Sequence, residues 1–310
     1  MPAFFLLATS KPLQPPIKME HKAGFVSIVG KPNVGKSTLM NILVGERLSI
    51  ITSKAQTTRH RIMGIINGED FQIVYSDTPG IMKPVYELHK SMMRFVNMSL
   101  EDADAVLFVT DIFEKHDEED VIQKLRKAET PVFLIINKID LADEAQVAEK
   151  IEYWKEYLNP VEIFAISALE RFNTDGILPA LLAKLPEHPP YFGKDALTDK
   201  TERFFAAEIL REKIFINYKK EIPYSTEVLI PSFQEKEDII VIQATILVER
   251  PTQKGIIIGD KGNMLKKTGI MAREEMEKFF QKKVFLETFV KVEPDWRNKE
   301  LKLKHFGYNE

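Results

Sequence analysis

The chain has 310 residues, 44% of them hydrophobic and 29% charged, which is the composition of a soluble globular protein with room for two domains. Its formal net charge is −3, so the chain as a whole has no strong attraction for nucleic acids or membranes. It contains no cysteine and no apolar run near the roughly 20 residues that span a bilayer, which excludes disulfides and thiolate metal sites and predicts no transmembrane helix. The lack of cysteine fits a reducing cytosol.

The first 20 residues carry no periodic pattern, and Pro15 and Pro16 argue against a regular element there. The apolar stretch at residues 4–8 is too short for a signal peptide, and no basic residue precedes it. We therefore expect residues 1–20 to be a disordered N-terminal extension, with Met19 as a candidate translation start.

Residues 21–185 alternate apolar runs with helical patterns, which is typical of a doubly wound α/β sheet. One run turns at Asn67-Gly68 into the next, and this hairpin signal predicts an antiparallel pair and hence a mixed sheet. Helical patterns lie at residues 37–43 and 85–100. The predicted strands are residues 25–29, 61–67, 71–76, 105–110, 132–136 and 163–166.

A glycine-rich stretch at residues 30–38 fits the pattern G-x-x-x-x-G-K-[ST] between an apolar run and a helical segment, as a phosphate-binding P-loop does. Its two glycines let backbone N–H groups point toward phosphates at a helix N-terminus. Lys36 adds a full charge for the β- and γ-phosphates, and the Ser37 hydroxyl can bind Mg²⁺. A plain glycine-rich turn is the alternative, which the flanking strand and helix disfavour. The predicted phosphate-binding residues are Gly30, Lys31, Pro32, Asn33, Val34, Gly35, Lys36, Ser37 and Thr38.

The polar, basic and aperiodic residues 53–61 lie where nucleotide-sensing GTPases carry their first switch, although a plain surface loop is the alternative. A threonine there can reach Mg²⁺ and the γ-phosphate, and we favour Thr58 over Thr57. The next strand ends in D-T-P-G, where the Asp77 carboxylate can hold Mg²⁺ directly or through water. The predicted Mg²⁺ ligands are therefore Ser37, Thr58 and Asp77.

Isoleucine follows the D-T-P-G turn, at the position where a Ras-like GTPase has a glutamine that positions water. Because Ile81 cannot hydrogen-bond water, the attacking water must be oriented otherwise or hydrolysis must be slow.

The strand at residues 132–136 is followed by N-K-I-D, and this motif predicts which nucleotide base is bound. The Asp140 carboxylate can accept hydrogen bonds from N1–H and the amino group of guanine, whereas adenine would leave it unpaired. Asn137 can bridge loops, the stem of Lys138 can lie over the ring, and backbone N–H groups of S-A-L can meet guanine O6. Beyond the P-loop, the predicted GTP-binding residues are Asp77, Thr78, Pro79, Gly80, Ile81, Asn137, Lys138, Ile139, Asp140, Ser167, Ala168 and Leu169.

A proline-rich stretch at residues 185–191 predicts a semi-rigid linker, residues 186–200, between a G domain at 21–185 and a second domain at 201–310. The second domain shows the order α-β-β-α-α-β. Its helices are predicted at residues 201–218, 253–258 and 263–281, and its strands at residues 226–233, 239–248 and 284–292.

G-D-K-G at residues 259–262 matches the GXXG loop of a KH domain, an α+β fold that clamps about four nucleotides of single-stranded RNA. A helix–helix turn is the alternative. Residues 254–304 contain 13 Lys and Arg but 8 Asp and Glu, and this local basic charge favours RNA. Three isoleucines before the loop offer a platform for bases, although the core must claim at least one of them. The predicted RNA-binding residues are Ile256, Ile257, Ile258, Gly259, Asp260, Lys261 and Gly262.

These G motifs resemble those of translation-factor-like GTPases. K-P-N-V at residues 31–34, Q-T-T-R-H-R at 56–61 and Ile81 narrow the resemblance to the Era family of bacterial ribosome-assembly GTPases, from about residue 21 to the C-terminus. The resemblance implies a G domain followed by a type II KH domain, slow hydrolysis of GTP to GDP with Mg²⁺, and binding of the 3′ end of 16S rRNA during maturation of the 30S subunit.

We predict Lys36, Thr58 and Asn33 as the catalytic residues. Asn33 is included because related GTPases that lack the glutamine use the P-loop asparagine to hold K⁺, and a role for K⁺ is a hypothesis here. We expect a cytoplasmic monomer. The family also associates peripherally with the inner membrane, although the sequence shows no amphipathic anchor.

Three alternatives stay open. One is an RNA-binding module with a purely structural nucleotide. The second is a GTP-gated signalling or cell-cycle protein whose C-terminal domain contacts protein or membrane. The third is a P-loop ATPase, which Asp140 argues against.

Overall fold

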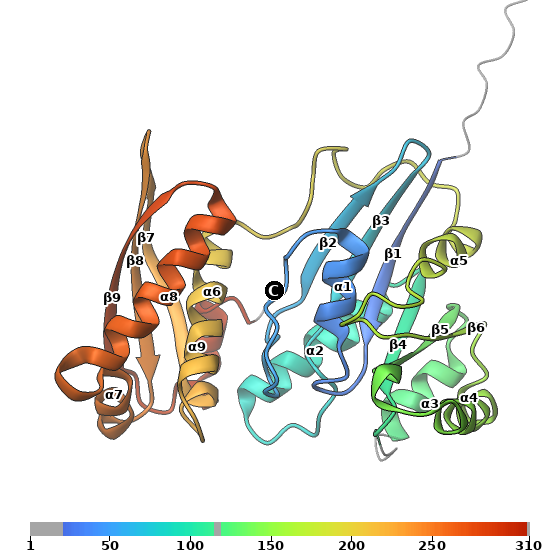
Figure 1. The fold of residues 1–310 in the computed structure, drawn as a ribbon, viewed down its shortest axis with the longest axis horizontal. Coiled ribbons are helices and arrows are strands. Elements are labelled where there is room, and N and C mark those ends of the chain that lie inside the picture. The colour runs from blue at the N-terminus through green and yellow to red at the C-terminus, as the bar shows by residue number, and fades with distance from the viewer. Residues whose placement is uncertain (1–20, 115–118, 309–310) are drawn as a thin grey trace, which may run out of the picture.

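The computed structural model describes residues 21–114 and 119–308, so the predicted N-terminal extension lies outside the described residues. Two bodies follow each other along the chain, an α/β body and a smaller α+β body (Figure 1). No helix in the described ranges is both long and apolar enough to cross a membrane.

A six-stranded sheet in the order β2-β3-β1-β4-β5-β6 forms the first body. All neighbouring strands are parallel except β2 and β3, which pair antiparallel, so the predicted doubly wound mixed sheet is confirmed. Its elements are β1 (Lys22–Val29), α1 (Lys36–Val44), β2 (Ile62–Asn67), β3 (Phe71–Asp77), α2 (Glu87–Glu101), β4 (Ala105–Asp111), α3 (Glu119–Lys127), β5 (Val132–Asn137), α4 (Glu144–Leu158), β6 (Glu162–Ala165) and α5 (Ile177–Lys184).

Both faces of this sheet are covered. The central strands are continuous apolar runs and are buried along their length, as expected for parallel strands between helices. Leu39 of α1 and Leu181 of α5 pack on one face, and Trp154 of α4 packs with Val96 of α2 on the other. This packing fixes the carboxyl ends of β1, β3 and β5 at one edge, where the predicted G motifs follow.

The second body has the predicted order, with β7-β8-β9 as its sheet; β7 and β8 pair antiparallel, and β8 and β9 pair parallel. The strands bury one face against the helices, and Ile257 is fully buried in that core. The short helix α9, which the sequence analysis did not predict, follows β9. The elements are α6 (Glu202–Asn217), β7 (Glu227–Glu235), β8 (Ile239–Val248), α7 (Pro251–Ile258), α8 (Asn263–Phe280), β9 (Lys283–Val292) and α9 (Glu300–His305).

The segment at residues 186–200 contains neither helix nor strand, as expected of a linker, but it does not hang free. Ile65 of β2 donates its backbone N–H to the carbonyl of Leu197 at 2.8 Å. The side-chain amide of Gln72 donates to the carbonyl of Phe192 at 2.9 Å and accepts from its N–H at 2.9 Å. The linker is therefore fastened along the sheet before α6 begins.

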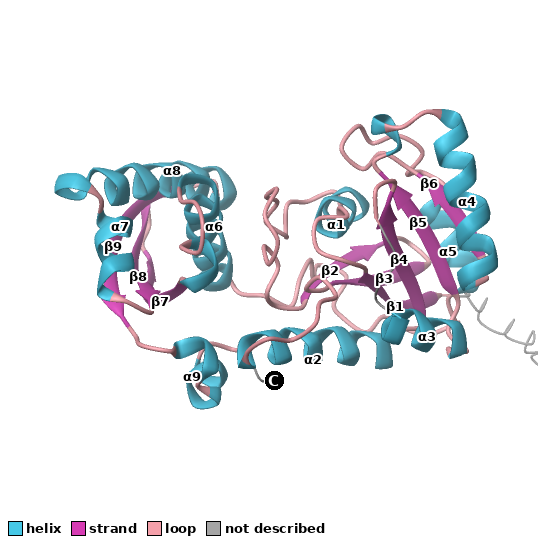
Figure 2. Cartoon of the chain, turned by 90° about the horizontal axis from the view of Figure 1, so that it is seen from below, coloured by secondary structure: helices cyan, strands magenta, loops and turns pink. Residues whose placement is uncertain are grey.

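The C-terminal segment folds back from the second body onto α2, and Figure 2 shows α9 beside one end of that helix. Trp296 is fully buried against Leu88, Met92 and Phe95 of α2, and its indole N–H donates to the carbonyl of Ser225 at 3.0 Å. The two bodies are thus joined by apolar packing as well as by the linker.

We predict that Trp296→Ala lowers the free energy of unfolding by about 3–5 kcal/mol, because it leaves a cavity the size of an indole between α2 and the C-terminal segment. Urea denaturation followed by circular dichroism measures the change. Leu301→Ala is the control, since that side chain is 84% exposed and its loss should change stability by about 0.5 kcal/mol or less. Equal losses in the two variants would contradict the packing described.

Candidate functional site

The loop between β1 and α1 lies close against two neighbouring segments, and glycines make this possible. Gly30 has φ +154°, and a Cβ built there would lie 2.0 Å from the carbonyl oxygen of Val109 in β4. A Cβ at Gly80, in the turn after β3, would lie 2.6 Å from the backbone nitrogen of Pro32. Both positions need glycine for this approach, which brings the P-loop and the D-T-P-G turn together.

Lys36 lies inside the P-loop. Its ammonium donates to the carbonyls of Gly30 at 3.0 Å and Lys31 at 2.8 Å. Burial lowers its pKa to about 8, although Asp77 and Glu114 oppose this shift. The loop thus holds a cation at the N-terminus of α1, where an anion is favoured.

Three oxygen-bearing side chains converge beside Lys36, from three different segments. The hydroxyl of Ser37 donates to Asp77 Oδ2 at 2.6 Å. Thr58 Oγ1 lies 2.9 Å from Ser37 Oγ and donates to Asp77 Oδ2 at 3.4 Å. By contrast, Thr57 Oγ1 lies 2.6 Å from Thr52 Oγ1 and donates to the carbonyl of Lys54 within the same loop. The geometry therefore favours Thr58 over Thr57.

The second carboxylate oxygen of Asp77 is buried and has no hydrogen-bond partner among the described residues. Burial raises the pKa of this carboxyl group, against the effect of Ser37 and Lys36. A carboxylate with two hydroxyl groups is an oxygen donor set of the kind Mg²⁺ prefers, so these residues fit the ion.

A second set of residues joins the loops at the far end of the site. Asn137 donates from Nδ2 to the carbonyl of Val34 at 2.8 Å and accepts at Oδ1 from the N–H of Ala168 at 2.9 Å. It therefore bridges three loops, as the sequence predicted. Lys138 pairs with Asp111 at 2.7 Å, and Asp140 is exposed.

Most of the predicted GTP-binding residues surround one cavity of about 450 Å³. Ile81 does not line it: its side chain is buried, and its N–H donates to the carbonyl of Gly30 at 3.0 Å. The predicted residues that line the cavity are Pro32, Asn33, Gly35, Lys36, Ser37, Thr38, Thr58, Thr78, Gly80, Asn137, Lys138, Asp140, Ala168 and Leu169. The remaining ones, Gly30, Lys31, Val34, Asp77, Pro79, Ile81, Ile139 and Ser167, lie behind or beside them.

Two of the three N–H groups that we predict to meet guanine O6 have acceptors within the chain. The N–H of Ser167 donates to the carbonyl of Phe172 at 3.2 Å, and that of Ala168 donates to Asn137. These two N–H groups therefore hold the loop after β6 together. Leu169, 77% exposed, stands at the mouth of the cavity.

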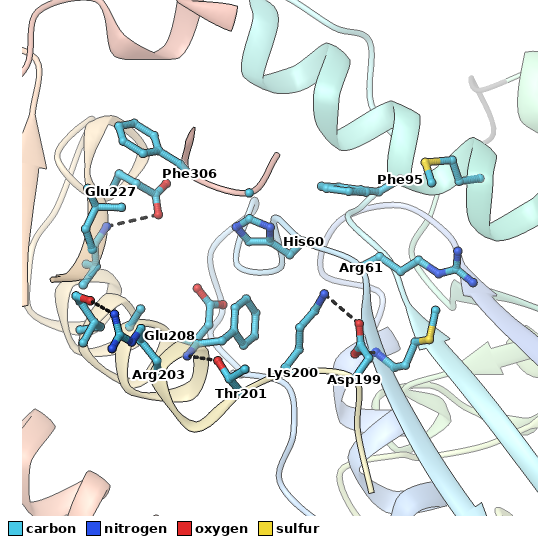
Figure 3. A pocket seen from close by; sticks show the side chains of 18 residues that line it. His60, Arg61, Phe95, Asp199, Lys200, Thr201, Arg203, Glu208, Glu227 and Phe306 are labelled. Atoms are coloured by element: carbon cyan, nitrogen blue, oxygen red, sulfur yellow. Dashed lines mark hydrogen bonds and ion pairs between the residues drawn. The ribbon is translucent and has the colours of Figure 1, made fainter. Parts of the chain in front are cut away.

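A larger cavity, of about 550 Å³, lies where the two bodies meet (Figure 3). The ring of His60 stacks on Tyr308 with centroids 4.3 Å apart and contacts Phe95 and Phe204. Burial lowers the pKa of His60 to about 3, with further lowering by Arg211, so the ring is neutral. This cavity belongs to the junction between the bodies rather than to the nucleotide site.

The GXXG loop between α7 and α8 has positive φ at three of its four residues, with +72° at Gly259, +48° at Lys261 and +81° at Gly262. Ile256 is 49% exposed, whereas Ile257 is 0% exposed and packs in the core. The prediction that Ile257 contacts RNA is therefore wrong. Ile258 is partly buried and Asp260 is exposed, so Ile257 is the one of the three isoleucines that solvent does not reach.

Sequence reasoning missed two sets of polar contacts. One is the pair between Asp111 and Lys138. The other is the contact of residues 54–59 with the second body, which involves Arg211 of α6. Neither carries a local sequence signal, because the partners lie far apart in the chain.

The first body carries a phosphate loop, a Mg²⁺-type donor set and a guanine-type motif at one edge of a mixed sheet, which together define a P-loop G domain. The α-β-β-α-α-β body that follows defines a type II KH domain. Residues 25–138 match the family model described as 50S ribosome-binding GTPase, and residues 221–297 match the model described as KH domain.

The chain is 44% identical to GTPase Era of Ruminiclostridium cellulolyticum over 293 residues, which cover 94% of this chain and 98% of the relative. It is 43% identical to GTPase Era of Staphylococcus haemolyticus over 294 residues, with coverage of 94% and 98%. The chain therefore belongs to the Era family of GTPases.

Two solved structures have the same fold over nearly their whole length. Era in complex with MgGDPNP and nucleotides 1506–1542 of 16S ribosomal RNA has a TM-score of 0.89 and 41% identity, over 93% of this chain and 99% of that one. A point variant of Aquifex aeolicus Era bound to GDP and AlF4⁻ has a TM-score of 0.87 and 41% identity, with the same coverage.

We predict that Asp140→Asn weakens GTP binding by about 100-fold or more and favours xanthosine triphosphate, because asparagine presents a donor where guanine also presents one. Titration with fluorescent analogues of both nucleotides measures the preference. Asp143→Asn is the matched control, since Asp143 caps α4 through Gln146 and asparagine is an equally good cap. Unchanged base preference in Asp140→Asn would remove Asp140 from the base site.

Proposed function

We propose that this protein is a Mg²⁺-dependent GTP switch that binds the 3′ end of 16S rRNA through its GXXG loop and assists maturation of the 30S subunit. The observation that carries the proposal is the convergence of Ser37, Thr58 and Asp77 beside Lys36 in a chain that ends in a KH domain. The similarity to Era bound to MgGDPNP and a 16S rRNA fragment supports both halves of it.

The residues divide the hydrolysis between them. Loop N–H groups and Lys36 hold the β- and γ-phosphates, and Ser37, Thr58 and Asp77 would hold the metal. Bound Mg²⁺ would offset charge on the phosphate oxygens. Water attacks the γ-phosphorus, a new P–O bond forms, the bond to the β–γ bridging oxygen breaks, and its electron pair leaves with GDP. The proton of the water ends on the released phosphate.

The water is not positioned by the residue after the D-T-P-G turn. Ile81 is 4% exposed and packs against Val29 and Val96, so it neither reaches the cavity nor offers a hydrogen bond. Slow intrinsic turnover is the consequence.

Asn33 is the P-loop residue that supports a role for K⁺. It has φ +66° and donates from Nδ2 to the carbonyl of Ser53, so it joins the P-loop to the predicted switch. A cation held there would lie beside the phosphates and lower the cost of the charge that develops between them.

We predict that GTP turnover is at least about tenfold faster in KCl than in NaCl at constant Mg²⁺, and that Asn33→Ala removes the difference. Phosphate release in the two buffers measures it. Equal turnover of the unaltered chain in K⁺ and Na⁺ would rule out the K⁺ role without affecting the rest of the proposed function.

The GXXG loop is the proposed RNA clamp. A Cβ at Gly262 would meet no atom within 4 Å, so the loop has open space at the N-terminus of α8, where phosphate is favoured. Lys261 adds a positive charge beside it. The exposed Ile256 can contact a base.

We predict that Gly262→Asp weakens binding of a 16S rRNA 3′-end oligonucleotide by at least about tenfold, because it puts a carboxylate in the path of the phosphates. Hydrolysis of GTP without RNA should stay unchanged. Gly45→Asp is the matched control, since Gly45 also has φ +81° and open space but lies in the G domain.

Crosslinking of the protein to RNA in cells, with and without a non-hydrolysable GTP analogue, tests target and gating together. Crosslinks at residues 259–262 that depend on the nucleotide and disappear in Gly262→Asp support the proposal. Crosslinks to protein alone would favour the signalling alternative.

The resemblance also implies a cytoplasmic monomer that associates peripherally with the inner membrane. These three points stay predictions; fractionation and the mass of the purified chain in solution test them.

A further inference from the structure

The predicted switch, residues 53–61, lies between the nucleotide cavity and the KH domain. In Figures 1 and 2 it runs through the space between α1 and α6. Its Thr58 faces Ser37 and Asp77, while the residues on either side of Thr58 contact the KH domain.

On one side, the backbone carbonyl of Thr57 accepts a hydrogen bond from Nη2 of Arg211, in the middle of α6. Arg211 is 1% exposed, and Glu208, one turn earlier, holds its guanidinium through Nε at 2.7 Å and through Nη2. A planar guanidinium fixed by a carboxylate presents its remaining N–H groups in one direction. Arg211 is therefore a rigid donor aimed at the switch.

On the other side, the side chain of Arg59 leaves the switch and enters the KH domain, where it is fully buried. Nη1 donates to the carbonyl of Thr226 at 2.7 Å and to Glu227 at 3.1 Å. Nη2 donates to the carbonyls of Pro223 at 3.1 Å and Tyr224 at 3.2 Å. These four acceptors leave Arg59 little freedom.

A third contact holds the beginning of the switch. Lys54 donates from Nζ to the carbonyls of Phe215 and Tyr218 at the C-terminal end of α6. Unpaired carbonyls at the end of a helix attract cations. The KH domain therefore contacts the switch before, beside and after Thr58.

We propose that Arg211 is a positioning residue for the GTP site: through the Thr57 carbonyl it fixes Thr58 where the Mg·triphosphate needs it, so the KH domain completes the site. This inference rests on the proposed role of Thr58. A loop fixed before binding loses less entropy when the nucleotide arrives, so GTP binds more tightly. GDP has no γ-phosphate for Thr58 to contact, so its affinity should not depend on how Thr58 is held. By linkage, GTP must stabilise the docking of α6 on the switch to the same degree.

The test compares Arg211→Gln with Arg203→Gln in the full-length chain. Arg203 lies on the same helix, is more exposed and donates to the carbonyl of Ile230 inside the KH domain, so it controls for the loss of an arginine from α6. We expect Arg211→Gln to weaken binding of GDPNP with Mg²⁺ about tenfold, as for the loss of one charge-assisted hydrogen bond, and to slow hydrolysis. GDP affinity should stay unchanged. Arg203→Gln should change neither nucleotide, and Arg211→Lys should restore part of the GDPNP affinity.

An unchanged ratio of GDPNP to GDP affinity in a folded Arg211→Gln chain overturns the inference. If that variant fails to bind GDP because it does not fold, Lys54→Gln replaces it, since Lys54 is only partly buried. A roughly threefold loss of GDPNP affinity alone then supports the inference, and no loss overturns it.

Thr58→Ala separates this inference from the function on which it rests. If Thr58→Ala weakens GDPNP binding and the Arg211 and Lys54 variants do not, only the docking role is lost. If Thr58→Ala has no effect, the assignment of Thr58 to the metal is wrong.

Discussion

A buried carboxylate at the end of β3 is the constraint around which the G domain is arranged. One oxygen of Asp77 receives hydrogen bonds from Ser37 and Thr58, and the other has no partner among the described residues. A buried carboxylate that lacks hydrogen bonds or a nearby positive charge raises the free energy of the folded state. A cation bound beside Asp77 would therefore stabilise the site. The parallel pairing of β1 with β3 sets Asp77 opposite Ile28, two residues before the P-loop begins. The strand register thus places the carboxylate and the phosphate loop together at one edge of the sheet.

The junction between the two bodies combines apolar packing, including that of Phe205 on the G-domain core, with buried polar contacts. The contacts of Arg59 and Arg211 across it are mainly between guanidinium groups and backbone carbonyls, both of which water solvates well when they separate. Contacts of this kind are directional and charge-assisted, so they specify one docked geometry. The buried cluster around Trp296, by contrast, is apolar and keeps the C-terminal segment on α2. The junction therefore has an apolar side at Trp296 and a polar side at Arg59 and Arg211.

The strands, the P-loop and the guanine motif could be predicted because each is a local pattern. Apolar runs marked the strands to within a few residues. The hydrogen-bonding groups of Asp140 favoured guanine over adenine as the base. The order α-β-β-α-α-β was equally visible in the periodicity.

What could not be predicted depends on distant partners. The donor to Thr57 lies 154 residues further along the chain, and no residue near either of them indicates the contact. That Ile257 is buried while Ile256 is exposed could be predicted only by knowing which side of α7 packs against the sheet. The hydrogen bond from the N–H of Ser167 to Phe172 could not be predicted either, because it arises from a tight loop and not from a motif.

The linker has a consequence of another kind. β2 is an edge strand of the sheet, and such a strand can add a strand from another molecule. Here the N–H of Ile65 is bonded to Leu197 and that of Met63 to the side chain of Asp199. The connection between the domains therefore also covers the edge that β2 presents. A change that removed the linker from β2 would leave these N–H groups without their acceptors and expose the edge to pairing with another strand.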